Sequence, residues 1–398
     1  MTTGAHATTF GRTMLEHWAL DPKITYLNHG TVGAPPKRVL AAQQAIRDQI
    51  ERQPAQFLLR ELTSIGFNPG WKGRPRLREA ADRVAEFLGV EGDDLAFVDN
   101  ATTGVNAVLR SLDLEAGDEI LLTDLGYGAI GNAAAFVARA AGARVRIVEL
   151  PYPVSDAGAI VEAVARGLGP RTRLAVLDHV TSESALILPL AEIASRCGEH
   201  GVPVLVDGAH APGAIALDID SLGVDWYTGN LHKWAWAPRS CGILWASPAR
   251  QRDLHPPVIS WGLDQGMAAE FDFVGTRDPS PYLAAPEAIA FMRELGLEAV
   301  QGYNHRLAWQ AARMLADRWG TELGMDEAMV GTMATLPLPD RFGSTKEEAL
   351  KLRGALLDLD RIEVQLHAWR GRLWVRVSAQ IYNDMSDVER LAGAVESR

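Results

Sequence analysis

The sequence predicts an α/β protein, with a mostly parallel sheet covered by helices on both faces and a smaller α+β unit at the C-terminal end. Short apolar strands alternate with amphipathic helices through the first 280 residues. The later part changes to a long helical stretch followed by strands. With 398 residues, 47% of them hydrophobic, the chain has enough apolar material for one large and one small domain.

The first part supplies the elements of the predicted sheet and its covering helices. The predicted strands span residues 95–99, 119–123, 144–150, 174–178, 203–207, 226–229 and 242–246. The predicted helices span residues 38–52, 75–88, 102–112, 133–141, 160–167 and 190–200. Short apolar strands separated by helices are typical of a parallel sheet that is buried on both faces.

The second part begins after a segment rich in proline, glycine and aromatic residues, 250–285, which we interpret as loop. A helix is predicted over 286–319. Strands follow at 332–337, 362–367 and 373–378, and a last helix at 386–396. We therefore expect an N-terminal segment (1–25), a large domain (26–285) and a small C-terminal domain (286–398).

Composition excludes several classes of protein. The net charge is −11 and no long basic run occurs, so we expect no nucleic-acid partner. No stretch approaches about 20 consecutive apolar residues, and Met1 to Thr13 lack the apolar centre of a signal peptide, so we expect no membrane segment. Two cysteines, Cys197 and Cys241, are too few for a disulfide framework or a cysteine-based metal site. The expected location is cytoplasmic.

A glycine-rich turn raises one alternative function. Gly126, Gly128 and Gly131 match G-x-G-x-x-G between a predicted strand and a helix, and Glu149 ends the next strand. That context suits an NAD-dependent oxidoreductase. However, a dinucleotide fingerprint usually opens the first strand–helix unit, whereas this one lies well into the sheet. A tight turn that places Tyr127 in a ligand crevice is the other interpretation.

Two motifs near the ends of later strands carry stronger chemistry. Asp207 ends a buried strand at the edge where open α/β sheets bind ligands. A carboxylate there needs a cation or hydrogen-bond donors, and a protonated pyridine nitrogen would serve; capping of the next turn is the alternative. Lys233, between His232 and Trp234, follows a short strand. A buried lysine amine with a lowered pKa is what a Schiff-base lysine requires.

Two further motifs suit binding of anionic groups. Thr102 and Thr103 precede a helix, where free N–H groups and hydroxyls bind phosphate, although a threonine at such a site is more often a plain N-cap. Arg376 lies inside an alternating strand, as either a solvent-facing residue or a planar clamp for a carboxylate.

Taken in order, these residues resemble the class V aminotransferase family of fold-type I pyridoxal-5′-phosphate (PLP) enzymes, over nearly the whole chain. The motifs that carry the resemblance are Thr102, Asp207 with His210, His232-Lys233, Gly275-Thr276-Arg277 and Arg376. Others are similar to the isopenicillin N epimerase-like branch, namely Tyr26 to Gly30 with Ala34-Pro-Pro36, Phe57 to Leu62, Ile259 to Gly262, Asp278 with Pro281-Tyr282, and Tyr382-Asn383. The resemblance implies a three-layer, aspartate aminotransferase-like large domain with a smaller α+β C-terminal domain.

The resemblance also implies a role for each site residue. Lys233 would form the Schiff base with PLP, Asp207 would pair with the pyridinium nitrogen, and Tyr127 would lie over the ring. The predicted phosphate ligands are Thr102, Thr103, Asn230 and His232, and the predicted contacts to the ring 3-oxygen are Ser182 and His210. The predicted substrate-binding residues are Asn28, His29 and Arg376. Thr276 would reach the cofactor of a neighbouring subunit, which implies a homodimer.

Some residues depart from the family pattern. Asn230 stands where a serine or threonine is usual, which makes its phosphate contact a weaker expectation. Neither cysteine lies in the late loop where cysteine desulfurases carry their nucleophile, so a persulfide-forming enzyme is disfavoured.

The implied chemistry begins with removal of the α-proton of an amino acid by Lys233 as general base. Epimerisation, β-elimination and transamination would share every residue named above. We favour an epimerase or C–S lyase over an aminotransferase on resemblance alone. The predicted candidates for the second acid of an epimerase are Tyr127, His210, His29 and Tyr382. A protein that binds the cofactor without catalysis is a further alternative.

Overall fold

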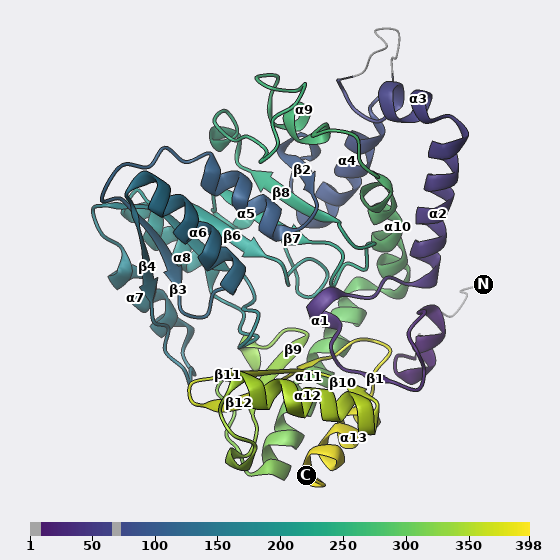
Figure 1. Ribbon diagram of the computed structural model, residues 1–398, viewed down its shortest axis with the longest axis vertical. Coiled ribbons are helices and arrows are strands. Elements are labelled where there is room, and N and C mark those ends of the chain that lie inside the picture. The colour runs from purple at the N-terminus through teal and green to yellow at the C-terminus, as the bar shows by residue number, and fades with distance from the viewer. Residues whose placement is uncertain (1–8, 66–72) are drawn as a thin grey trace, which may run out of the picture.

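The computed structural model describes residues 9–65 and 73–398. Its centre is a seven-stranded sheet with the order β2-β8-β7-β6-β5-β3-β4 (Figure 1). Neighbouring strands from β7 to β4 are parallel, whereas β8 runs antiparallel to both β7 and β2. The bounds are Leu95–Val98 (β2), Glu119–Thr123 (β3), Arg144–Val148 (β4), Thr172–Asp178 (β5), Val204–Gly208 (β6), Trp226–Asn230 (β7) and Gly242–Ala246 (β8). The predicted α/β fold class is confirmed.

Helices cover both faces of this sheet and make three layers. One face packs against α5 (Ala101–Arg110), α6 (Gly128–Ala141) and α9 (Met267–Asp272). The other face packs against α4 (Arg76–Leu88), α7 (Ala157–Gly167) and α8 (Leu190–Glu199). The longer α2 (Lys37–Arg52) and α10 (Ser280–Leu295) lie together at the side of the molecule (Figure 1). Most strand residues are buried, as a sheet between two helical layers requires.

A second unit, at the bottom of Figure 1, holds a three-stranded antiparallel sheet with the order β11-β12-β9. Its strands are Met333–Pro337 (β9), Gln365–Trp369 (β11) and Arg372–Ser378 (β12). Its helices are α11 (Leu297–Trp319), α12 (Lys346–Asp360) and α13 (Met385–Glu396). Val375 and Val377 enter the hydrophobic core, whereas Arg376 between them points to the opposite face. That polar face looks toward the large sheet, because Arg376 bonds the Ser182 carbonyl there.

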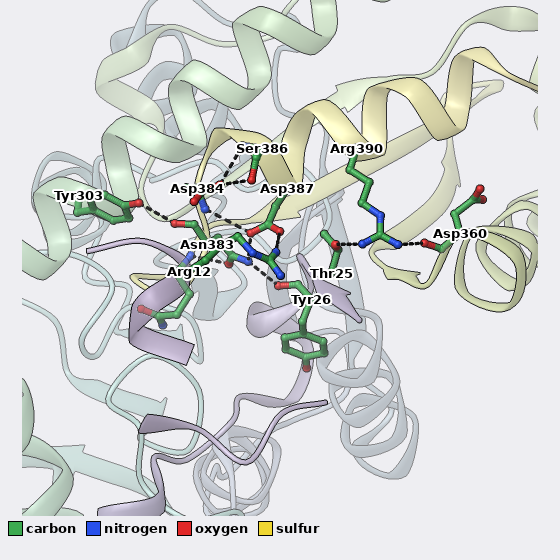
Figure 2. A network of polar contacts seen from close by, with 11 residues as sticks. Arg12, Thr25, Tyr26, Tyr303, Asp360, Asn383, Asp384, Ser386, Asp387 and Arg390 are labelled. Carbon is green, nitrogen blue, oxygen red and sulfur yellow. Dashed lines mark hydrogen bonds and ion pairs between the residues drawn. The ribbon is translucent and has the colours of Figure 1, made fainter. Parts of the chain in front are cut away.

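The N-terminal segment is fastened to this second unit. Strand β1 (Thr25–Tyr26) pairs in parallel with β10 (Ile362–Glu363). Figure 2 shows the polar contacts that surround this junction at the start of α13. Arg12 forms an ion pair with Asp387, and Asn383 Nδ2 donates to the Tyr26 carbonyl at 3.1 Å. The chain then turns through α1 (His29–Val32) toward the large sheet.

The boundaries of the three predicted segments stay predictions. The structure adds that Thr25 to Asn28 lie against the C-terminal unit, since Asn28 also bridges to Ser378.

Three predicted elements differ from the structure. The helix predicted over 286–319 is wrong as one element, because α10 begins at Ser280 and gives way to α11 at Gly296. Gly296 has φ +86°, a conformation that glycine adopts at little cost. The predicted loop 250–285 contains α9, and the strand predicted over 362–367 is divided between β10 and β11. None of the described helices is long and apolar enough to cross a membrane.

Candidate active site

The carboxyl ends of β5, β6 and β7 meet the start of α5 around a cavity of about 210 Å³. This is the edge of an open α/β sheet at which ligands bind. Eight predicted site residues line the cavity: Thr102, Tyr127, Ser182, Asp207, His210, Asn230, His232 and Lys233. Thr31, Asn100, Ala101, Asp178 and Ala209 complete the wall.

Lys233 follows β7 and presents its amine to this cavity. Its Nζ lies 3.1 Å from His210 Nε2. Burial and, to a lesser extent, the Arg376 guanidinium lower the pKa of Lys233 to about 8, against the opposing charges of Asp207 and Asp178. A larger share of this amine than of an exposed lysine is therefore free base near neutral pH, as nucleophilic or basic chemistry requires.

Two carboxylates lie side by side at the floor of the cavity. Asp178 and Asp207 are paired residues in the parallel register of β5 and β6, and both are buried. Burial raises the pKa of each, and the neighbouring Asp207 raises that of Asp178 further. The Ala209 amide donates to Asp207 Oδ1 at 3.0 Å. The sequence analysis missed Asp178, although it too is an aspartate at the end of a buried strand.

The amino end of α5 forms the anion-binding wall. Asn100 caps the helix by accepting from the Thr103 amide at 2.9 Å, and Asn230 Oδ1 accepts from the Ala101 amide at 2.8 Å. Thr102, between them, lines the cavity, and no described residue accepts from its amide. Thr103 does not line the cavity, because its amide and hydroxyl both turn to Asn100. The side-chain oxygen of Asn230 therefore positions the start of α5 rather than contacting a phosphate.

His232 completes this wall, and only one of its two ring nitrogens is bonded to the backbone. Its Nδ1 lies 3.0 Å from the Cys241 carbonyl, so this nitrogen carries the proton. The Nε2 side is left for the cavity. Burial lowers the pKa of His232 to about 4. A bound phosphate dianion would favour the charged ring and oppose that shift.

Arg376 reaches the cavity wall from the second unit. Its Nη1 donates to the Ser182 carbonyl at 2.6 Å, and its Nη2 donates to Thr31 Oγ1 at 2.9 Å. The side chain is only 3% exposed, and its Nε has no hydrogen-bond partner among the described residues. Burial lowers its pKa to about 10. A buried guanidinium with an unused N–H suits a carboxylate ligand better than a solvent-facing role.

Residues of the N-terminal segment hold Thr31, the hydrogen-bond partner of Arg376, in position. Thr31 Oγ1 donates to Asn28 Oδ1 at 2.5 Å, and Asn28 Nδ2 donates to Glu363 Oε1 at 2.8 Å. Asn28 does not line the cavity, so its position is that of a support rather than of a direct ligand. The sequence analysis did not single out Thr31. Its neighbourhood in the Asn28-His29-Gly30 motif was the one available signal.

Both ring nitrogens of His29 are hydrogen-bonded to groups outside the cavity. Its Nδ1 lies 2.8 Å from Tyr382 Oη, and its Nε2 lies 3.0 Å from the Lys233 carbonyl. Burial lowers the pKa of His29 to about 4. His29 and Tyr382 therefore hold the backbone of Lys233 and do not line the cavity.

Tyr127 and Thr276 occupy very different positions. Tyr127 caps α6, is 48% exposed and lines the cavity. Thr276 lies in a separate, mainly apolar hollow with Leu58, Leu59 and Leu62. The structure does not bring Thr276 to the cavity of its own chain.

Two glycines of the G-x-G-x-x-G sequence lack the close contacts that a dinucleotide fingerprint uses. A Cβ placed on Gly128 or Gly131 would meet nothing within 4 Å. A fingerprint needs its glycines for close backbone approach and for helix–strand packing. This turn serves to present Tyr127, and the oxidoreductase hypothesis loses its structural basis.

Comparison with known proteins identifies the family. The sequence profile of the aminotransferase class-V family matches residues 66–391. This chain belongs to that family. It is 34% identical to isopenicillin N epimerase of Streptomyces clavuligerus, over 95% of this chain and 96% of that protein. It is 33% identical to a probable chloroplastic L-cysteine desulfhydrase of Arabidopsis thaliana, over 94% of this chain and 83% of that protein.

Solved structures confirm the fold. A cystine C–S lyase in complex with its product cysteine persulfide superposes with a TM-score of 0.76 at 24% identity, covering 94% of this chain and 97% of that one. Cysteine desulfurase from Thermococcus onnurineus gives a TM-score of 0.79 at 18% identity, covering 99% of both chains. The predicted fold class and family resemblance are confirmed.

Family membership indicates PLP as the cofactor, and the residues of the cavity fit it. Buried Asp207 offers a carboxylate to a pyridinium nitrogen. The amide of Thr102 at the start of α5 suits a phosphate, and the Lys233 amine suits an aldehyde carbon. Their individual roles toward the cofactor stay predictions.

Proposed function

We propose that this protein is a PLP-dependent C–S lyase that eliminates the β-substituent of a cysteine-type amino acid. The observation that carries the proposal is that the Lys233 amine, with a pKa of about 8, shares one small cavity with Thr31 and Ser182, both of which bond the buried Arg376 guanidinium. The similarity to L-cysteine desulfhydrases supports the choice of substrate class.

Arg376 would bind the substrate α-carboxylate through its unused Nε and a neighbouring Nη. This fixes the orientation of the bonds at Cα before any proton moves. Lys233, as the free amine, would then take the α-proton. PLP, when bound, supplies the electron sink that makes this proton acidic.

Loss of the β-thiol completes the reaction. For L-cysteine with one water, the products are pyruvate, ammonia and hydrogen sulfide, so no oxidant or reductant is needed. The chain's two cysteines, Cys197 and Cys241, are both buried in the hydrophobic core. Neither presents a thiol to the cavity, which disfavours transfer of sulfur to the enzyme.

Epimerisation is the second candidate, and one residue favours it. It needs an acid on the face of Cα opposite Lys233. His29 and Tyr382 are bonded to each other outside the cavity, and His210 lies beside Lys233 itself. Of the four residues considered from the sequence, Tyr127 is the one left for this role, because it lines the cavity and is half exposed.

Incubation of the PLP-loaded protein with L-cysteine, cystine and other amino acids in deuterated water separates these reactions. Release of sulfide or thiol together with pyruvate supports the lyase. Deuterium at Cα with inversion and no release supports the epimerase. Conversion of PLP to its amine form with release of the oxo acid would support an aminotransferase instead.

We also propose that Thr276 acts in a homodimer, where it reaches the cofactor of the second copy. Its position in an exposed hollow away from its own cavity is compatible with that role. Mixing Lys233→Ala protein with Thr276→Val protein tests this. Each hybrid dimer holds one site that carries both substitutions and one that carries neither, so partial recovery of activity is expected. No recovery from stable hybrid dimers would contradict the proposal.

A further inference from the structure

Two tryptophans behind the cavity differ in what their indole N–H groups contact. Trp234 and Trp236 are both fully buried. Trp234 Nε1 donates to His210 Nδ1 at 3.4 Å. Trp236 Nε1 has no hydrogen-bond partner among the described residues. The pair therefore offers an indole with a specific acceptor and a matched indole without one.

The contact of Trp234 determines where His210 carries its proton. An indole nitrogen can only donate, so His210 Nδ1 must present a lone pair. Burial, together with the nearby charge of Lys233, holds the pKa of His210 well below its usual value, so the ring is neutral. A neutral imidazole has one N–H, and here it must be on Nε2.

That proton faces the catalytic amine. His210 Nε2 lies 3.1 Å from Lys233 Nζ. Two donors would oppose each other if Lys233 were an ammonium, whereas a free amine accepts the Nε2–H with its lone pair. The tautomer of His210 thus favours the uncharged form of Lys233.

We propose that Trp234 is a positioning residue that fixes His210 as the Nε2–H tautomer and thereby favours the uncharged form of Lys233. This inference rests on the proposed function only in taking that amine as the base at Cα. It goes beyond the implied roles of Lys233 and His210, because it assigns the state of both to a third side chain.

Other charges around Lys233 act in both directions. The Arg376 guanidinium, from β12, disfavours the ammonium form, whereas Asp178 and Asp207, from β5 and β6, favour it. His232 faces His210 and disfavours a charged imidazole. Because the two carboxylates favour the ammonium form of Lys233, a fixed Nε2–H on His210 is needed to oppose them. In the other tautomer, His210 Nε2 would accept a hydrogen bond from the ammonium and stabilise it.

The first experiment needs no substitution in the network. ¹⁵N NMR of the full-length chain without cofactor reports which ring nitrogen of His210 is protonated, with His210→Gln used only to assign the signals. We expect an unprotonated Nδ1 and a protonated Nε2 between pH 7 and 9. Protonation at Nδ1 would overturn the proposal.

The second experiment compares Trp234→Phe with Trp236→Phe. The rate at which acetic anhydride modifies Lys233 is followed against pH by mass spectrometry of the peptide, in the full chain without cofactor. The unsubstituted chain should show a midpoint near the lysine pKa of about 8. Trp234→Phe should raise the midpoint by about one pH unit, which makes labelling at pH 7 about tenfold slower. Trp236→Phe, which loses packing but no acceptor, should leave the midpoint unchanged.

An equal midpoint in all three proteins, or equal shifts in both variants, would sink the inference. In the PLP-loaded enzyme, the acid limb of Cα–deuterium exchange should move with Trp234→Phe in the same direction. The labelling requires no turnover, so its result tests this inference independently of the lyase proposal. If Trp234→Phe does not fold, the NMR result on the unchanged chain decides.

Discussion

The two sides of the cavity are built in different ways. The cofactor side comes from consecutive strand ends and one helix start, namely β5, β6, β7 and α5, and it lies within one sheet. The proposed substrate side is built around Arg376, which bonds the Thr31 hydroxyl and the backbone carbonyl of Ser182, two residues far from it in the sequence. A side built from neighbouring elements of one sheet is suited to hold a cofactor that all relatives share. A side built from distant parts of the chain can differ between relatives that act on different amino acids.

The largest expected effect removes the group that serves both sides. Lys233→Ala should lower Cα–deuterium exchange by about 10³-fold, the range for loss of a general base. Borohydride reduction should no longer attach PLP to the chain. Lys351→Ala, at an exposed position of α12, is the matched control and should keep both properties. Retained covalent PLP in Lys233→Ala would show that another lysine holds the cofactor.

Arg376→Lys tests the substrate side alone. Lysine keeps the charge but loses the fork that bonds Ser182 and Thr31 while leaving an N–H for substrate. We expect KM to rise about 100-fold, as for truncation of a buried charge contact, with the Kd of PLP unchanged. Arg372→Lys, on the same strand but paired with exposed Asp340, should change neither constant. A parallel loss of PLP affinity in Arg376→Lys would break the division between the two sides.

Asp207→Asn tests the cofactor side alone, with its neighbour as the control. Loss of the carboxylate should raise the Kd of PLP about 30-fold, because the pyridinium would lose a buried charge partner. Burial and the neighbouring Asp207 hold the pKa of Asp178 well above its usual value, which favours the neutral acid. Asp178→Asn, which resembles that neutral acid, should change the Kd less than about threefold. Equal effects, measured by equilibrium dialysis, would mean that the pair shares the role.

The smallest effect probes how the N-terminal segment supports the substrate side. Thr31→Val is nearly isosteric and removes the acceptor of Arg376 Nη2. Loss of one hydrogen bond to a charged group should raise KM about fivefold, at constant kcat. Thr31→Ser keeps the hydroxyl and should restore KM. An unchanged KM in Thr31→Val would show that Ser182 alone orients the guanidinium.

The sequence predicted which residues of the sheet edge gather at the cavity, because the signals there are local. Asp207 ends an apolar strand, Lys233 follows one, and Thr102 begins a helix, so each position is readable from its own neighbours. The substrate side was predicted less completely. The strand pattern left Arg376 open as a solvent-facing residue or a carboxylate clamp, and only the family resemblance favoured the clamp. The position of Thr31 follows the pairing of β1 with β10, which no local pattern reports.

Local signals also misled at three positions where a hydrogen bond or a backbone conformation competes with the predicted role. Thr103 was expected to hold phosphate, yet the structure gives its hydroxyl and amide to Asn100. His29 was expected near the substrate, and its ring bonds Tyr382 and the Lys233 backbone instead. Gly296 divides a helical pattern that looked continuous. The contact of Thr103 is a local helix cap, that of His29 joins residues far apart in the sequence, and Gly296 has a positive φ; hydrophobic periodicity reports none of the three.

The attachment of the N-terminal segment to α13 has a consequence for biosynthesis. All seven strands of the large sheet have been synthesised once Ala246 is added. Thr25–Tyr26 have no pairing partner until β10 at Ile362–Glu363 is synthesised, and Arg12 has none until Asp387. The wall proposed to receive the substrate is therefore completed only after Arg376 has been synthesised, long after the strands that carry the predicted cofactor residues.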